Sequence, residues 1–530
     1  MQNFKDRTMK RIYTFIIIVA LSIGACTDLN QEPLNGTPPN ATFGVFGNTT
    51  SYLAKIYASY SLTGNNGPAG SPDLQLVNDE GFTSYIRAYW KAQELTTDEA
   101  VIAWTDAGIQ DLNTHTWSSD NQFVKVLYYR LFLIISYAND FLTQTEADKV
   151  DAYGYTEDQK ATLVNYRAEA RFLRALAYWH ALDLFRNIPL VTTITTDFPT
   201  QVPPSEIFNF IESELIDIES EMVEAGQNDY GRADQAALWM LQAKLYLNAE
   251  VYIGENRSSD AISALEKVLN GPYSLEDNYA DLFKADNHLS NELIFTLPSD
   301  GLRSQSYGST TFLVNASIGG TMTASDFGVS TGWAGLRTTS KLVDKFPDVD
   351  GSTDSRAMFY TDGQTKEISE LLEFTNGYAV TKFTNVTSDG EDGVDVGFVD
   401  TDYPMFRLGD AYLMYAEAVL RGGGGSRATA VSLINELRER AYGDASGNII
   451  DTDLNLDFII DERARELYYE GHRRVDLVRF GLYTGGSYNW PWKGNNIDGA
   501  SISDHLEIFP IPANDLIANP ELDQNDGYGN

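Results

Sequence analysis

Cysteine is almost absent from this sequence, which holds one, Cys26, among 530 residues. A single thiol excludes an intramolecular disulfide and a cluster of thiolate metal ligands. The five histidines are scattered and show no metal-ligand spacing. A glycine-rich phosphate-binding loop is also lacking. We therefore expect neither a cofactor nor a metal centre.

Basic residues are scarce as well. The chain has 38 Lys and Arg against 75 Asp and Glu, for a formal net charge of −37. A surface this negative repels phosphate backbones and anionic lipid faces, so we expect no nucleic-acid partner. Hydrophobic residues make up 43% and aromatic residues 12% of the chain. That content is enough for a substantial core and excludes a disordered chain.

Long apolar runs are missing except near the N-terminus, where IYTFIIIVALSIGA (residues 12–25) follows MKR (residues 9–11). The run is short for a membrane span and has the length of a signal-peptide core. Cys26 comes directly after small residues, as in a bacterial lipobox. We expect residues 1–25 to be a lipoprotein signal peptide, Cys26 to carry the lipid and residues 26–40 to form a tether. The alternative is a leftover cysteine in an ordinary signal peptide.

Helical periodicity dominates the chain beyond the tether. The strongest patterns predict helices over residues 122–142, 163–185, 234–250 and 258–275, and a helix pair over residues 403–442. Such pairs, with Ala, Leu and Tyr at packing positions, resemble tetratricopeptide-type repeats at irregular spacing. Residues 298–335 are rich in Ser, Thr and Gly, and residues 387–402 in Gly and Asp, which predicts long functional loops. The predicted fold is mostly α, a helical scaffold that carries a loop-built face.

Four segments resemble signature segments of the SusD/RagB family, the outer-membrane glycan-binding lipoproteins of Bacteroidetes. They are RAEARFLRALAYWHALDLFRNIPLV (167–191), YPMFRLGDAYLMYAEA (403–418), ERARELYYEGHRRVDLVRFG (462–481) and FPIPANDLIANPELDQNDGY (509–528). The segment CTDLNQEP, which begins at Cys26, also resembles the mature start of that family. Together the segments span the chain in order.

The resemblance implies one SusD-like domain, residues 41–530, with four tetratricopeptide-like units. It also implies a partner, a SusC-like TonB-dependent transporter barrel that the lipoprotein caps at the outer membrane. In the family the lipoprotein captures oligosaccharides at the cell surface and releases them into the barrel. It breaks no bonds, so we expect a binding protein and not an enzyme.

Residues 76–117 are dense in the side chains that a carbohydrate site needs. Sugar rings stack their C–H faces on Trp or Tyr, and their hydroxyls need polar partners. Resemblance to the starch-binding members of the family assigns stacking to Trp104 and hydroxyl contacts to Asp79 and Arg87. Ala107 replaces an Asn of the family pattern, which leaves starch itself open. In the alternative, Trp104 is a core aromatic, and Asp79 and Arg87 form an ordinary ion pair.

A second aromatic platform is expected from the Ser/Thr/Gly-rich loop. Residues 331–346 resemble a family segment in which an aromatic residue flanks the site, which makes Trp333 the candidate. Tyr307 is a further candidate platform in the same loop region. A tryptophan between small residues is costly to leave in water unless something covers it. In the alternative, the protein itself covers it.

Other patterns are weaker. The carboxylate pairs at residues 79–80 and 98–99 resemble a glycosidase acid and nucleophile, but a chain with 75 acidic residues contains such pairs by chance. The acidic loops 348–354 and 389–402 lack the ligand spacing of an EF-hand and indicate solvated loops. Residues 470–476, EGHRRVD, predict a structural ion-pair network.

The sequence therefore predicts a surface lipoprotein that binds a neutral polysaccharide or oligosaccharide, with a glucan favoured. The negative charge argues against polyanionic glycans such as alginate. Both an α-linked, starch-like glucan and a β-linked, laminarin-like glucan remain open. Two alternatives are a family member that captures peptides and a tetratricopeptide-type scaffold of the transporter complex without a ligand of its own.

Overall fold

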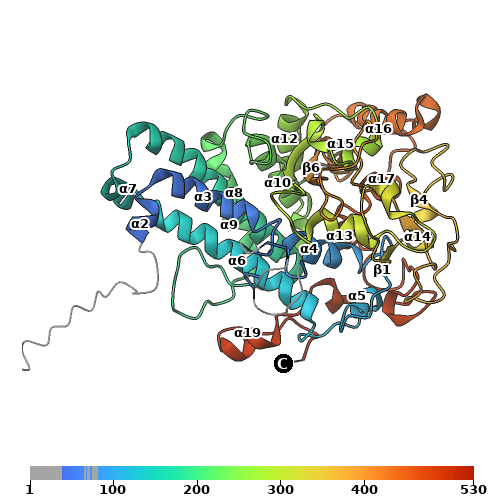
Figure 1. Cartoon of the computed structure of the whole chain (residues 1–530), viewed down its shortest axis with the longest axis horizontal. Helices are drawn as coiled ribbons and strands as arrows, with labels where there is room; N and C mark the ends of the chain where they lie inside the picture. The colour runs from blue at the N-terminus through green and yellow to red at the C-terminus, as the bar shows by residue number, and fades with distance from the viewer. Residues whose placement is uncertain (1–38, 65–66, 69–71, 75–80, 530) are drawn as a thin grey trace, which may run out of the picture.

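The computed structural model describes residues 39–64, 67–68, 72–74 and 81–529, and Figure 1 shows how their elements are arranged. The predicted signal peptide, Cys26 and nearly all of the predicted tether lie outside the described residues, and so does Asp79. None of the helices that the structure describes combines the length and apolar character needed to cross a membrane.

The first half of the chain is built almost entirely from helices. They are α2 (Pro39–Phe43), α3 (Phe46–Ala58), α4 (Tyr85–Glu94), α5 (Gln110–Thr114), α6 (Gln122–Gln144), α7 (Ala147–Tyr153), α8 (Glu157–Phe185), α9 (Pro204–Ile218), α10 (Gln235–Leu247), α11 (Ala249–Ile253) and α12 (Ser258–Leu269). The two longest, α6 and α8, pack along each other, with α3 and α9 against α8. This group fills the left of Figure 1.

The second half mixes helices with long loops. Its helices are α13 (Ser309–Ala316), α14 (Ser340–Val343), α15 (Leu408–Leu420), α16 (Arg427–Tyr442), α17 (Leu456–Leu467), α18 (Arg473–Arg479) and α19 (Ala513–Ala518). The strands of the described residues are β1 (Val101–Ile102), β2 (Leu293–Leu297), β3 (Leu336–Arg337), β4 (Phe359–Tyr360), β5 (Ala379–Val380) and β6 (Tyr403–Arg407). They form three antiparallel pairs, β1–β3, β2–β6 and β4–β5.

The two longest predicted helices are confirmed. The helix expected at residues 122–142 is α6, whose first turn is capped by the Asn121 side chain. The helix expected at residues 163–185 is α8, which begins six residues earlier than predicted. A capping box formed by Thr156 and Gln159 starts it there, because each side chain accepts a hydrogen bond from the other's backbone N–H.

Two predicted boundaries are wrong. The helix expected over residues 258–275 is α12, which ends at Leu269, just before the Gly-Pro step at Pro272. The helix pair expected over residues 403–442 consists of α15 and α16, but residues 403–407 form the strand β6. A short apolar run fits a buried strand or a buried helix equally well. Here antiparallel pairing with β2 decides the outcome, and the sequence does not show that partner.

The remaining helices form packed pairs. Helix α10 packs on α12, α12 on α15, and α15 on α16. One hydrophobic core cluster includes residues from Phe43 to Leu522. The prediction of a mostly α-helical fold with helix pairs and a loop-rich part is confirmed. The loops and short strands of residues 298–407 lie beside the helix pairs, on the right of Figure 1.

Buried charges tie this loop-rich part to the helices. Arg407 contacts Glu292, Glu466 and Glu470 at N–O distances of 2.8, 2.7 and 2.7 Å. Arg356 joins the same set through Glu466, at 3.1 Å. None of these five side chains, which we call the Arg407 network, is more than 1% exposed. The network links β6, the start of β2 and the end of α17.

The ion-pair network predicted for residues 470–476 is present, but its main acidic partners come from elsewhere. Arg473 Nε lies 2.7 Å from Asp98 Oδ1, across 375 positions of sequence. Arg474 Nη1 lies 3.5 Å from Asp183 Oδ2. Neighbouring acidic residues were expected to supply these contacts. The packing of α18 against α4 instead brings Asp98 to it.

Candidate functional site

The two predicted tryptophan platforms meet at the pairing of β1 with β3. Beyond this pair, the Ala103 N–H donates to the Gly335 carbonyl oxygen at 2.9 Å. Trp104, the next residue, donates its indole N–H to the Trp333 carbonyl oxygen at 3.0 Å. The two indole rings lie 6.3 Å apart, centroid to centroid, with their planes inclined by 46°. Residues separated by 229 positions thus form one aromatic surface.

The loop that carries Trp333 is fastened to the C-terminal end of α13. The Trp333 N–H donates to the Asn315 carbonyl at 2.7 Å, and the Gly335 N–H to the Ala316 carbonyl at 2.8 Å. A side chain at position 335 would clash, since a Cβ there would lie 2.8 Å from the Trp104 ring. Backbone hydrogen bonds and close packing therefore fix the relative orientation of the two indoles.

Tyr307 continues this surface. Its ring lies 6.3 Å from that of Trp333, at 55°, and 4.9 Å from that of Phe398. Trp104, Trp333 and Tyr307, which we call the aromatic arc, are all partly exposed. Phe398, also partly exposed, was not among the predicted residues. Its only sequence signal is that it is an aromatic residue inside the Gly/Asp-rich loop predicted to be functional.

Arg87 lies behind the arc. It projects from α4, is 7% exposed, and places its guanidinium carbon 5.4 Å from the Trp104 ring centroid and 5.0 Å from that of Phe312. Its Nη1 donates to the Tyr307 carbonyl oxygen at 3.4 Å. A cation held against these rings stabilises their positions. The expected contact of Arg87 with a ligand hydroxyl stays a prediction, as does the role of Asp79, which lies outside the described residues.

The loop after Trp104 supplies exposed polar groups that the sequence reasoning did not single out. Thr105 and Asp106 are exposed, as is Ala107. The Gln110 amide donates to the Trp104 carbonyl at 2.7 Å and so fixes the backbone at the platform. A hydroxyl and a carboxylate next to an aromatic platform match the donors and acceptors of a sugar ring.

Asp98, the first carboxylate of the pair at residues 98–99, has a structural use. Burial alone would raise the pKa of Asp98, but the Arg473 guanidinium outweighs it and lowers that pKa to about 2. Asp98 also accepts a hydrogen bond from the Tyr488 hydroxyl at 2.5 Å. Asp98 is therefore ionised at neutral pH and bonded to Arg473 and Tyr488. A general acid must carry a proton, so Asp98 does not suit that role.

Carboxylates of both acidic loops accept hydrogen bonds from backbone N–H groups. Asp348 accepts hydrogen bonds from the N–H groups of Ser352 and Thr353, and Asp400 from those of Gly301 and Val394. Within the described residues no three His, Cys, Asp or Glu side chains are arranged to hold a metal ion. Asp348 and Asp400 thus help to shape these loops.

The structure is that of a helical scaffold protein whose loops carry an exposed aromatic surface. Comparison with known sequences shows its family. A sequence model of the SusD family matches residues 363–528. The chain is 35% identical to the "Starch-binding protein SusD" of Bacteroides thetaiotaomicron, over 99% of this chain and all of that one. It is 24% identical to the "SusD-like protein P25" of Formosa agariphila, over 98% of each chain. The chain belongs to the SusD family, and the resemblance predicted from its segments is confirmed.

Solved structures agree on the fold. The surface glycan-binding protein A of Bacteroides thetaiotaomicron, solved in complex with laminarihexaose, superposes with a TM-score of 0.69. That match covers 90% of this chain and 99% of the other, at 18% identity. A structure described as a laminarin-binding SusD-like protein gives a TM-score of 0.67 over 91% of this chain and 99% of the other, at 22% identity.

Proposed function

We propose that the protein captures a neutral glucan at the cell surface by stacking it on the aromatic arc. The observation that carries this proposal is the arc itself: Trp104, Trp333 and Tyr307 are held rigidly side by side and left partly exposed. The starch-binding relative, 35% identical over the whole chain, supports a glycan ligand. The negative net charge disfavours a polyanionic one.

The tilt between the rings favours a curved ligand. Successive ring planes are inclined by 46° and 55°. A glycan that stacks on neighbouring rings must change direction between them. Helical glucans, α-1,4-linked as in starch or β-1,3-linked as in laminarin, follow such a path, whereas a flat β-1,4-linked chain does not. Because each sugar contact is weak, several platforms must act together.

We also propose a location for the protein and a transporter partner. Residues 1–25 are removed as a signal peptide, Cys26 carries the lipid, and residues 41–530 form one SusD-like domain at the outer membrane. This domain passes its ligand to a SusC-like TonB-dependent transporter and breaks no glycosidic bond. Palmitate labelling that is lost in Cys26→Ala tests the anchor, and co-purification of a barrel protein from membranes tests the partner.

Affinity electrophoresis against amylopectin, laminarin, hydroxyethyl cellulose and alginate tests the ligand. We expect retardation by amylopectin or laminarin, and none by alginate. Trp104→Ala and Trp333→Ala should each weaken binding by roughly 30-fold, the loss of about 2 kcal/mol typical of a tryptophan hot spot.

Trp492→Ala is the matched control. Trp492 is also partly exposed, and its indole N–H also donates to a backbone carbonyl, that of Ile368 at 2.9 Å. It should bind like the wild type. Retardation that survives both arc variants would keep the function but reject the arc. No retardation by any glycan would leave peptide capture or a scaffold role.

A further inference from the structure

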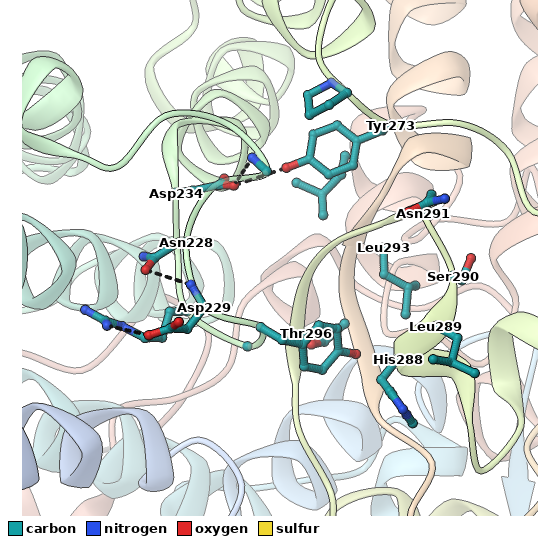
Figure 2. A pocket seen from close by; sticks show the side chains of 16 residues that line it. Asn228, Asp229, Asp234, Tyr273, His288, Leu289, Ser290, Asn291, Leu293 and Thr296 are labelled. Atoms are coloured by element: carbon teal, nitrogen blue, oxygen red, sulfur yellow. Dashed lines mark hydrogen bonds and ion pairs between the residues drawn. The ribbon is translucent and has the colours of Figure 1, made fainter.

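Two cavities flank Tyr230, in the loop that precedes α10. The smaller has a volume of about 260 Å³ and the larger about 550 Å³, and Tyr230 and His288 line both. Ligand sites in proteins start at about 300 Å³, so the pair has the size for an extended small ligand. Figure 2 shows the smaller cavity open between three groups of side chains: Asp234 with Tyr273, Asn228 with Asp229, and His288 with Leu289.

Tyr230 is an exposed ring in a fixed position. It is 49% exposed, although its hydroxyl donates to Asp402 Oδ2 at 2.5 Å. Its ring meets the His288 ring edge-on, with centroids 6.1 Å apart. The next residue, Gly231, has a left-handed φ of 76°, and a Cβ there would lie 2.4 Å from Pro298. The loop is thus packed closely against the neighbouring segment, and the tyrosine does not need to be ordered by a ligand.

The polar groups around the two cavities suit a neutral polyhydroxy ligand. The larger cavity is lined by five aspartates and one arginine: Asp286, Asp300, Asp392, Asp400, Asp402 and Arg303. In the smaller, Arg232 is occupied by its ion pair with Glu169. Most of these carboxylates already accept hydrogen bonds from the protein. A carboxylate has about four lone-pair sites, so each can still accept a hydrogen bond from a ligand hydroxyl, and its charge repels anions. An aromatic face beside such acceptors is the combination on which a pyranose ring stacks.

The larger cavity adjoins the aromatic arc. Leu302 and Val394 line it and are 64% and 63% exposed. Their loops touch at Gly301, where a Cβ would lie 2.5 Å from the Phe398 carbonyl oxygen. The Phe398 ring in turn contacts Tyr307 of the arc. The loops that line the larger cavity are therefore the same two loops that carry Tyr307 and Phe398 beside the arc.

We propose that Tyr230 and the two cavities beside it form a second platform, which binds a distal stretch of the same neutral glycan chain that the arc holds. This inference rests on the proposed function. The second platform would be weak alone and would act through effective concentration once the arc has engaged the chain. It would give the protein a preference for long glycans over short ones.

Chain length separates the two platforms experimentally. Tyr230→Ala should lower the affinity for amylopectin or laminarin roughly tenfold and leave that for maltotriose or laminaritriose unchanged, because a trisaccharide occupies the arc alone. Trp104→Ala should lower both affinities. Tyr230→Phe, which keeps the ring, should retain the affinity for the polysaccharide. Tyr412→Ala is the matched control, since Tyr412 is also partly exposed and its hydroxyl also donates to a carboxylate, that of Glu436.

His288 reports on the second platform directly. With five histidines in the chain, a ¹³C-histidine-labelled protein gives few signals, and His288→Gln assigns one of them. Maltoheptaose or laminarihexaose should shift the His288 signal in the wild type and not in Tyr230→Ala. If the wild type binds glycan while the His288 signal stays still and Tyr230→Ala keeps its polysaccharide affinity, the second platform is refuted and the proposed function stands. If the wild type binds no glycan at all, both fail.

Discussion

The Arg407 network and the aromatic arc both join distant parts of the chain, by opposite means. The network places full charges where water does not reach, each paired with several partners. The arc uses uncharged rings, fixes them through backbone hydrogen bonds and leaves them partly exposed. The network gives a unique internal geometry, whereas we propose that the arc serves an outside partner.

The difference comes from what each contact costs. Burying a charge is expensive, and an ion pair recovers that cost only where the geometry is good, so a buried network specifies position more than it adds stability. A partly exposed ring costs little free energy, and it contributes binding free energy when a ligand covers it. Buried ion pairs beneath the long loops can therefore fix the position of these loops. The surface of the loops can then stay uncharged.

Acid should break the buried ion pairs of the protein first, and with the largest effect; the Arg407 network is one set of these pairs. Burial alone would raise the pKa of Glu417 and of Glu462, but arginines outweigh it: Arg479 and Arg421 lower the pKa of Glu417, and Arg356 leads in lowering that of Glu462, each to about 2. Such groups stabilise the fold above their unfolded pKa of about 4.5, and that contribution is lost as the pH falls toward 2. By pH 3 the loss is about 2 kcal/mol for each carboxylate.

Asp98 behaves in the same way with a smaller shift, from 3.8 to about 2, and loses about 1 kcal/mol by pH 3. The three together remove about 5 kcal/mol, comparable with the whole stability of many domains. The contribution of Glu94 to stability depends on pH in the opposite direction. Burial raises the pKa of Glu94 from 4.5 to about 7, so its contribution is lost as the pH rises from 4.5 through 7. Urea unfolding followed by circular dichroism should thus show a maximum near pH 5 and a steep fall below 4.5. Glucan affinity should stay level from pH 8 to 5. A stability that is flat between pH 4.5 and 3 would contradict the account.

Removing one member of the Arg407 network should have the next largest effect. Arg407→Met leaves Glu466 and Glu470 buried with fewer partners, which costs about 3–5 kcal/mol of unfolding free energy. Lys366→Met is the control, since Lys366 pairs with Asp344 at the surface, where the two side chains are 36% and 57% exposed. That change should cost less than about 1 kcal/mol. Equal costs in urea unfolding would show that the buried network contributes no more than a surface pair.

The sequence predicted the long helices well because their signals are local. Apolar periodicity and caps such as Asn121 or Thr156 decide α6 and α8 within a few residues of chain. Residues 403–407 were expected in a helix because their strand partner, β2, lies more than a hundred positions away. When a distant partner determines the secondary structure of a short segment, the residues of that segment do not predict it.

The candidate site shows the same difference between local and distant signals. Trp104 and Trp333 were predicted through the family resemblance and Tyr307 as a further aromatic of the Ser/Thr/Gly-rich loop, and the structure brings the three together. No local signal placed Phe398 beside them or paired Arg473 with Asp98 across 375 positions. Ring contacts and buried ion pairs arise from packing of distant segments, so single-sequence reasoning gives the candidate side chains and not their neighbours.

The smallest predicted effect tests whether the geometry of the arc, and not only its rings, determines binding. Gly335→Ala places a Cβ 2.8 Å from the Trp104 ring, so the indole must shift by several tenths of an ångström. Overpacking of this kind costs about 1 kcal/mol or more, and we expect glucan affinity to fall by roughly fivefold, less than in Trp104→Ala. Gly486→Ala is the control, because its new Cβ meets Ser501 at an ordinary 3.4 Å. If Gly335→Ala binds glucan as the wild type does, the indole tolerates displacement, and the rigid arrangement that distinguishes the arc from a loose pair of rings has no role in recognition.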